Sequence, residues 1–344
     1  MEILLLKIRK NLFDLTAILL VLSFFLLSIA CSNEELPQED EDTEIVGGGD
    51  TDDDSTGDGE NEEETEEEEE ETEEEEEENE EEEEEETDPA TIPSDILDTL
   101  SEWKITFPLD ASGKDSATDS ETGTDCDDRN NNAYEIKDIT GEIPSPYSDY
   151  FYVNGDEVIF KAHCGGATTS GSSYPRSELR QTPGGGSNYW SMQDYQYLDV
   201  RVRAVNLPIN KPEVSMVQIH GPEDEPLRVE FRSDGQGLHV TQNEDTTKEY
   251  VLPYVLGEQL RVTVTVDNGD ITCRIENESR PDEDVWEETW EAEDATGYFK
   301  VGCYTQSNMF LSSCKGSSYS DELPESFGAV AVKDLSLTTN YTEE

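Results

Sequence analysis

Short runs with a two-residue period dominate the chain from about residue 95 onward. Runs such as "YLDVRVRAV" and "GAVAVKDLSLT" alternate apolar and polar residues, and Gly, Pro, Asn and Asp separate one run from the next. This alternation is typical of strands that bury one face. Asn-Gly pairs in "VNGDE" and "DNGD" predict tight hairpins. Because no sustained helical periodicity connects the strands, the pattern predicts an all-β, antiparallel sandwich or barrel and argues against βαβ units.

One segment has a helical pattern. "SDILDTLSEW", residues 94–103, predicts a short helix with Ser94 as its N-cap. The remaining strand pattern shows no internal repeat and no change of composition. Residues 91–344 are therefore expected to form one large β-domain, which is long enough to bury a single core.

Charge divides the chain into two parts. The net charge is −63, and residues 32–88 hold 36 Asp or Glu and no Lys or Arg, while residues 89–344 carry a net charge of −28. The Glu-rich run has no apolar side chains to bury and its charges repel, so residues 32–90 are predicted to be a disordered linker. A fluctuating helix is the alternative, but like charges four residues apart oppose it. Such acidity also argues against a nucleic-acid partner.

The first 31 residues read as an export signal. A basic patch precedes an apolar stretch over residues 15–30, and "LLSIAC" resembles a bacterial lipobox that ends at Cys31. We expect residues 1–31 to be a lipoprotein signal peptide and Cys31 to carry a lipid anchor. The expected location is the outer membrane, facing the cell surface or the periplasm. An uncleaved transmembrane anchor with an incidental cysteine is the alternative.

Five cysteines follow Cys31, so at least one is expected to be free. Cys273 alternates with isoleucines and is predicted to lie in the core. Disulfides between Cys126 and Cys164 and between Cys303 and Cys314 are plausible, although sequence does not establish connectivity. No CxxC pair or His/Cys cluster suggests a metal site.

Three strands carry unusual polar sets on alternate positions. The sets are Arg176, Glu178 and Arg180; Gln218 and His220; and Lys300, Tyr304 and Gln306. Their neighbours Leu179, Ile219 and Val301 alternate with them and are expected to face the core. Gly302 shares the polar face and is expected to leave a gap through which a ligand could approach.

Each set has a structural alternative when it is taken alone. Arg–Glu–Arg on a strand often forms a cross-strand ladder of ion pairs, a single histidine is usually structural, and a strand tyrosine usually packs. His163 and His239, outside these sets, are expected to be structural. Together, however, the cationic and amide groups predict a site for a polyanion, because guanidinium groups bind carboxylates in a fixed geometry.

The same segments resemble the signature motifs of one enzyme family. "RSELR" (176–180), "QIH" (218–220) and "YFKVGCYTQ" (298–306) are similar to the three motifs of the alginate lyases of polysaccharide lyase family 7. "LSEWKITFPLD" and "VAVKDLSL" resemble the first and last strands of that family. The resemblance spans about residues 95–340. It implies a β-jelly-roll with a concave substrate cleft.

The resemblance also implies roles for these residues. Arg176, Gln218, His220 and Tyr304 match the catalytic positions of the family. Arg180, Lys300 and Gln306 match positions that hold substrate, and Glu178 is expected to fix the arginines. The implied protein is a monomer that binds alginate and needs no cofactor or metal.

The implied reaction is β-elimination on a uronic acid polymer, which leaves a 4,5-unsaturated uronate. Arg176 and Gln218 would neutralise the carboxylate, His220 would remove the C5 proton of guluronate, and Tyr304 would protonate O4. Tyr304 could perform both steps for mannuronate. Within the second motif, Ile219 indicates a preference for guluronate-containing blocks.

Other functions are compatible with parts of the pattern. A lyase for another polyuronate such as glucuronan, a non-catalytic carbohydrate-binding protein and a structural surface protein are the alternatives. The presence of both His220 and Tyr304 favours catalysis. Endo or exo action would depend on loops near the cleft, for which residues 184–196 and 307–318 are candidates.

Overall fold

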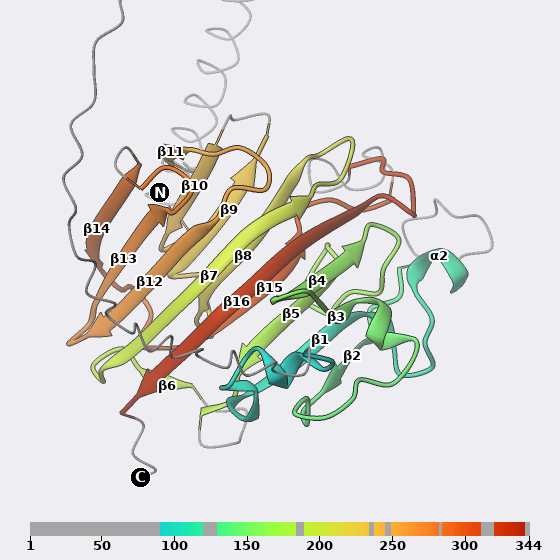
Figure 1. Ribbon diagram of the computed structural model, residues 1–344, viewed down its shortest axis with the longest axis horizontal. Helices are drawn as coiled ribbons and strands as arrows, with labels where there is room; N and C mark the ends of the chain where they lie inside the picture. The colour runs from blue at the N-terminus through green and yellow to red at the C-terminus, as the bar shows by residue number, and fades with distance from the viewer. Residues whose placement is uncertain are drawn as a thin grey trace, which may run out of the picture. The chain divides into compact units, whose positions relative to one another are not determined.

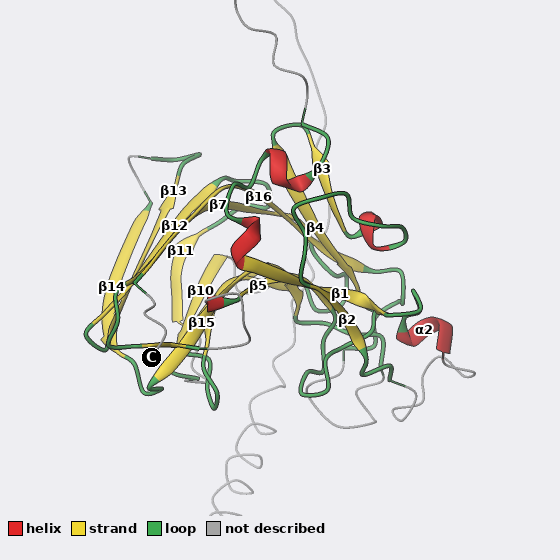
Figure 2. Cartoon of the chain, turned by 90° about the horizontal axis from the view of Figure 1, so that it is seen from below, coloured by secondary structure: helices red, strands yellow, loops and turns green. Residues whose placement is uncertain are grey.

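Two antiparallel sheets pack face to face in the computed structural model, which describes residues 90–119, 129–183, 189–233, 237–244, 249–281, 284–310 and 320–340. Figure 1 shows β7 (Gln196–Asn206) and β16 (Phe327–Thr339) side by side within one sheet, and Figure 2 shows the two sheets as separate layers. This nearly all-β architecture is a jelly-roll sandwich, and it confirms the fold class that the alternating runs predict. The predicted signal peptide, Cys31 and the predicted acidic linker up to residue 89 lie outside the described residues.

Every strand pairing within the two sheets is antiparallel. In spatial order, the nine-stranded sheet contains β11 (Glu249–Pro253), β10 (Gly237–Gln242), β9 (Leu227–Arg232), β8 (Glu213–His220), β15 (Thr296–Thr305), β5 (Arg176–Gln181), β1 (Trp103–Asp110) and β2 (Ala133–Ile136), with β6 (Trp190–Ser191) paired to β15. The seven-stranded sheet contains β14 (Val285–Glu291), β13 (Asp270–Asn277), β12 (Leu260–Asp267), β7 (Gln196–Asn206), β16 (Phe327–Thr339), β4 (Glu157–His163) and β3 (Phe151–Asn154).

The helix predicted for residues 94–103 is wrong in type and extent. Two 3₁₀ turns, η1 (Pro93–Asp95) and η2 (Leu100–Glu102), precede β1, and Ser94 donates its hydroxyl to Thr140 O instead of capping a helix. The fully buried Leu97, Leu100 and Trp103 recur every three residues. Of the three, only Leu100 lies in a 3₁₀ turn, since Leu97 falls between η1 and η2 and Trp103 begins β1. The segment therefore buries these side chains by following the core in short turns and an extended residue, and not as one face of a helix.

The other helical elements are also short. They are α2 (Ser116–Asp119) and η3 (Tyr147–Asp149). Among the residues that the structure describes, no helix is long and apolar enough to cross a membrane.

Both predicted Asn-Gly hairpins are present. One joins β3 to β4, where Asn154 pairs with Glu157 and the turn is Gly155 and Asp156. The other joins β12 to β13 at Asn268 and Gly269. Asn268 and Gly269 have φ angles of 53° and 92°, which a tight turn between right-twisted strands requires.

The two sheets differ in how their strands are buried. β7, β12 and β13 alternate buried and partly exposed residues, as strands with one wet face do. The central strands of the nine-stranded sheet, β5, β8 and β15, are instead buried on nearly every residue. Their polar outward side chains must therefore satisfy one another, because few of them reach water.

The proposed disulfides do not form in this structure. Cys164, Cys273 and Cys303 are buried free thiols, and the intended partners Cys126 and Cys314 lie outside the described residues. Cys303 belongs to the inward face of β15 and packs in the core, which explains why it is not directed toward a surface loop. The core position predicted for Cys273 is confirmed.

Candidate active site

The three polar sets lie on three neighbouring strands. β15 pairs with β8 on one side and with β5 on the other, so Lys300 lies opposite both Gln218 and Arg180. All three strands direct their alternate polar residues away from the core, while Leu179, Ile219 and Val301 are fully buried beneath them. Sheet order thus brings together residues that are more than a hundred positions apart in sequence.

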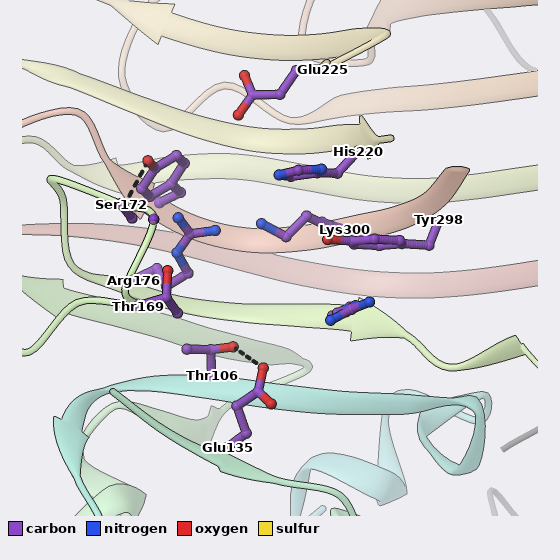
Figure 3. Close-up of a pocket in the computed structure, with 12 residues that line it drawn as sticks. Thr106, Glu135, Thr169, Ser172, Arg176, His220, Glu225, Tyr298 and Lys300 are labelled. Atoms are coloured by element: carbon purple, nitrogen blue, oxygen red, sulfur yellow. Dashed lines mark hydrogen bonds between the residues drawn. The ribbon is translucent and has the colours of Figure 1, made fainter. Parts of the chain in front are cut away.

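A pocket opens over these strands (Figure 3). Its lining comprises Thr106, Glu135, Thr169, Gly171, Ser172, Arg176, Arg180, His220, Glu225, Tyr298, Lys300 and Tyr304. Five of the eight predicted site residues are in this set. Glu178, Gln218 and Gln306 are not in it, and all three are buried.

Glu178 is the centre of the floor. Its carboxylate is 1% exposed and accepts from Arg176 Nη1 at 2.9 Å, from Lys300 Nζ at 2.7 Å and from Gln218 Nε2. One carboxylate from β5 therefore binds a side chain from each of the three motif strands. If the Arg–Glu–Arg set were purely structural, ion pairs within it would be expected, and Arg176 and Glu178 do form one. Arg176 nevertheless also lines the pocket.

The charges around Glu178 do not cancel. Burial alone would raise the pKa of Glu178, but Lys300 and Arg176 outweigh it and hold that pKa below its usual value. Burial, together with the neighbouring Arg176, lowers the pKa of Lys300 to about 8. Two cations facing one carboxylate leave the floor with a net positive charge, which suits an anionic ligand.

His220 has one ring nitrogen committed and one available. Its Nδ1 lies 2.5 Å from Gly221 O, and a carbonyl oxygen can only accept, so Nδ1 carries the proton. Burial, followed by the nearby Lys300, lowers the pKa of His220 from 6.5 to about 4. The imidazole is therefore neutral at pH 7, and its Nε2 has a free lone pair.

The turn after His220 is held by Asp294. Its Oδ2 accepts from the amide of Asp224 at 3.1 Å, and Gly221 N donates to Asp224 O at 2.9 Å. A Cβ on Gly221 would lie 1.6 Å from Asp294 Oδ2. A side chain at this position would displace the Asp294 carboxylate and so loosen the turn whose carbonyl orients His220.

Tyr304 is held from two sides. Its hydroxyl lies 3.0 Å from Ser172 Oγ, and the guanidinium carbon of Arg176 lies 3.8 Å from the centre of its ring. Ser172 also bonds to both the carbonyl oxygen and the amide of Tyr174, which anchors it. Figure 3 shows Arg176 between Ser172 and Lys300 on the pocket floor.

Glu178 does not hold both arginines, as the sequence suggested. Among the described residues no carboxylate forms an ion pair with Arg180, whose guanidinium carbon lies 4.0 Å from the centre of the Tyr298 ring. Lys300 and Gln218 take the places at Glu178 that a second arginine would need. Arg180 is thus the cation of the lining whose charge is left for a ligand.

Gly302 does not open a gap for a ligand. Its φ is 145°, and an added Cβ would lie 2.7 Å from Ser177 O and 2.8 Å from the Cα of Glu178. The missing side chain lets β15 approach the backbone of β5 and deepens the contact that places Glu178. The expectation of a ligand channel at this glycine is wrong.

Gln306 and the two other histidines also lie away from the pocket lining. Gln306 is 4% exposed. His163 Nε2 lies 2.8 Å from Asp115 Oδ2, and His239 on β10 is buried opposite Glu230. Across the described ranges, no group of three or more His, Cys, Asp or Glu could hold a metal ion.

Comparisons with known proteins agree with this geometry. A sequence model described as alginate lyase matches residues 97–339, which is most of the chain. The chain belongs to the alginate lyases of polysaccharide lyase family 7. Among the curated proteins, none matches closely enough to count as a relative.

Solved alginate lyases share the fold. The polysaccharide lyase family 7 enzyme AlgAT5 is 29% identical with a TM-score of 0.55, over 73% of this chain and 100% of that one. The alginate lyase from Corynebacterium sp. is 26% identical with a TM-score of 0.56, over 74% and 100%. The marine enzyme AlyA1 from Zobellia galactanivorans, at 24% identity and a TM-score of 0.50 over 73% and 100%, shows the likeness of fold alone.

The alginate lyase pocket contains residues that the sequence did not single out. Tyr298 and Ser172 contact predicted site residues, and Glu135 and Glu225 line opposite sides of the pocket in Figure 3. Tyr298 could have been found, since it has the parity of Lys300 within the third motif. Ser172 carries no such signal, because its contact with Tyr304 spans 132 positions.

The two carboxylates of the lining have cationic partners. Glu135 accepts from Lys104 Nζ at 2.6 Å, and Glu225 pairs with Arg228. Each partner compensates a negative charge that would otherwise repel a polyanion. The lining therefore stays electropositive in the alginate lyase despite the acidity of the whole domain.

Glu178→Gln is expected to destabilise the protein by about 3–5 kcal/mol, because it leaves Arg176 and Lys300 buried without a counter-charge. The measurement is chemical denaturation followed by tryptophan fluorescence. Glu276→Gln is the matched control, since Glu276 pairs with the part-exposed Arg274 and its loss should cost less than about 1 kcal/mol. Equal losses in the two variants would show that Glu178 does not hold the floor together.

Proposed function

We propose that this protein depolymerises alginate by β-elimination and releases oligouronates with a 4,5-unsaturated end. The observation that carries the proposal is the neutral His220, whose Nε2 is available in a pocket that also presents Tyr304 and Arg176. A base, an acid and a cation for the carboxylate are the three groups that this reaction needs.

Arg176 supports binding of the uronate carboxylate at the reacting sugar. The C5 proton is a poor acid while that carboxylate keeps its full negative charge, and a guanidinium beside it stabilises the enolate-like charge that develops. Arg176 lines the pocket and is fixed by Glu178. Gln218 assists from below, because it holds the other oxygen of Glu178.

His220 and Tyr304 then divide the proton transfers. Nε2 of His220 takes the C5 proton of a guluronate, and the C–H electron pair forms the C4–C5 double bond. The C4–O4 bond breaks, its electron pair goes to O4, and Tyr304 gives O4 a proton. The enzyme ends with a protonated imidazole and a phenolate, and return of one proton between them resets it.

Ser172 supports Tyr304 through both states. Its single hydroxyl proton can be donated to Tyr174 O, so that it accepts from Tyr304, or it can rotate toward the phenolate once Tyr304 has lost its proton. Both partners lie 3.0 Å from Ser172 Oγ. The rotation needs no movement of the backbone.

Guluronate-containing blocks are proposed as the preferred substrate. The preference rests on Ile219 in the second motif and on a separate histidine base. Ile219 is fully buried, so it acts through the placement of β8, which carries His220.

A panel of polymers tests the substrate. Poly-guluronate, poly-mannuronate and glucuronan are incubated with the protein, and the ultraviolet absorbance of the unsaturated product is followed. The expected result is a several-fold faster rise with poly-guluronate than with poly-mannuronate, and no rise with glucuronan. A rise with glucuronan alone would identify another polyuronate lyase, and binding without any rise would identify a carbohydrate-binding protein.

Tyr304→Phe is expected to lower kcat by about 10²–10⁴-fold while alginate binding persists, because only the acid is removed. Turnover is measured by absorbance and binding by calorimetry. Tyr174→Phe is the matched control, since the Tyr174 ring lies 6.1 Å from that of Tyr304 and its hydroxyl contacts Lys211. Unchanged turnover in Tyr304→Phe would exclude Tyr304 as the acid.

Cys31 is proposed to anchor the enzyme to the outer membrane through a lipid. Two features support this: the lipobox-like "LLSIAC" and the polar segment that directly follows it. Wild-type protein is expected in the membrane fraction and to incorporate a fatty-acid analogue. Cys31→Ser is expected to remain uncleaved or to be mislocalised, and to incorporate no label. Ser32→Ala is the control, and equal labelling of Cys31→Ser would contradict the anchor.

A further inference from the structure

Tyr298 lies between the proposed base and a cation of the pocket. Its ring is stacked on the imidazole of His220, with centroids 5.4 Å apart and planes only 7° from parallel. The guanidinium carbon of Arg180 lies 4.0 Å from the centre of the same ring. Because β15 lies between β8 and β5, one phenol ring can contact both partners.

The stack completes the orientation of His220. The Gly221 carbonyl fixes where Nδ1 points, but one hydrogen bond leaves the ring free to tilt about that direction. A parallel aromatic plane removes this freedom and covers one face of the imidazole. Tyr298 is itself 5% exposed, so the cover is part of the packed pocket wall.

Charged groups surround the imidazole on several elements. Lys300 on β15 and Arg176 on β5 disfavour the protonated ring, and Glu178 on β5 favours it. Glu225, on the loop after β8, lines the same pocket and is paired with Arg228. Tyr298 adds no charge to this balance, because burial raises its pKa to about 12. Tyr298 affects the protonation state of His220 by excluding water from the imidazole.

Arg180, the second residue that contacts the Tyr298 ring, has the plane of its guanidinium group fixed by that contact. No carboxylate of the described residues pairs with it, so the ring of Tyr298 is its main support. A guanidinium stacked on an aromatic face keeps its N–H edge free for a carboxylate. Loss of the ring would therefore weaken substrate binding as well as the placement of the base.

We propose that Tyr298 is a positioning residue, whose ring holds His220 ready to accept a proton and Arg180 ready to bind a carboxylate. This inference rests on the proposed function for its kinetic consequences only. The stack itself can be tested on the resting enzyme, because the chain has just three histidines and their ring signals can be resolved by NMR.

The experiment compares Tyr298→Ala with the conservative Tyr298→Phe. In Tyr298→Ala, water reaches the imidazole, so the pKa of His220 should rise from about 4 toward 6.5. Since the base must be neutral, the acid limb of kcat/KM should move to higher pH. We also expect kcat to fall by about tenfold to a hundredfold and KM to rise. Tyr298→Phe keeps the ring and should restore the wild-type pKa, kcat and KM.

Tyr134→Ala is the control for loss of an aromatic ring, because the Tyr134 ring packs against Tyr147 in a tilted arrangement, with ring centres 5.3 Å apart, outside the pocket lining. It should leave the His220 titration and the kinetics unchanged. The dispersion of amide chemical shifts in NMR spectra verifies that each variant is folded. The ring signal that disappears in His220→Gln is assigned to His220.

Three results would overturn the proposal: an unchanged His220 titration with unchanged kinetics in Tyr298→Ala, an equal effect of Tyr134→Ala, or failure of Tyr298→Phe to restore the wild-type values. If Tyr298→Ala does not fold, Tyr298→Leu replaces it in the comparison, because leucine fills part of the space without an aromatic plane. If the wild-type protein does not cleave alginate but Tyr298→Ala shows the expected change in the His220 titration, the proposed function is refuted and the stacking of Tyr298 on His220 is still supported.

Discussion

The buried carboxylate of Glu178 is the interaction on which the pocket depends. It binds Arg176 on its own strand, Lys300 on β15 and Gln218 on β8, and so joins the three central strands of the nine-stranded sheet on their outward face. Burying a carboxylate is costly unless several donors surround it. Once they do, none of the donors can move without leaving the charge unsatisfied, and this makes the floor rigid. Rigid placement of charged groups before the substrate arrives is a large part of electrostatic catalysis.

Around this floor, different side chains hold the different polar groups of the pocket in place. Glu178 fixes Arg176 and Lys300, while Tyr298 supports Arg180 and covers His220. Asp294 fixes the turn that sets the tautomer of His220. Lys300, His220 and Tyr304 are thus each held by a neighbour from another strand or loop, and Arg176 by a neighbour on its own strand. Lys104 and Arg228 compensate the two carboxylates of the lining, which allows an acidic domain to present a cationic pocket.

Much of this could be predicted from the sequence. The period-two runs and both Asn-Gly turns predicted the sandwich and two of its hairpins correctly, because side-chain alternation and positive φ angles are local properties. The parity of the motifs also placed Arg176, Lys300 and Tyr304 on one face correctly. The errors came where packing overrides local pattern. Two short 3₁₀ turns replace the expected helix before β1, Gly302 lets two strands approach each other, and Cys164 and Cys303 are free thiols buried in the core.

The sequence by itself determined which residues alternate, which of them are polar, and through its three motifs which family the chain belongs to. Only the tertiary structure decided which side chains contact one another. Parity along a strand says which face a side chain occupies, but it does not say which strands are neighbours or how far they are shifted. The order β8–β15–β5 is what gives Glu178 its three partners and places Tyr298 between His220 and Arg180. A loop fold then brings Ser172 to Tyr304, a contact that no local spacing encodes.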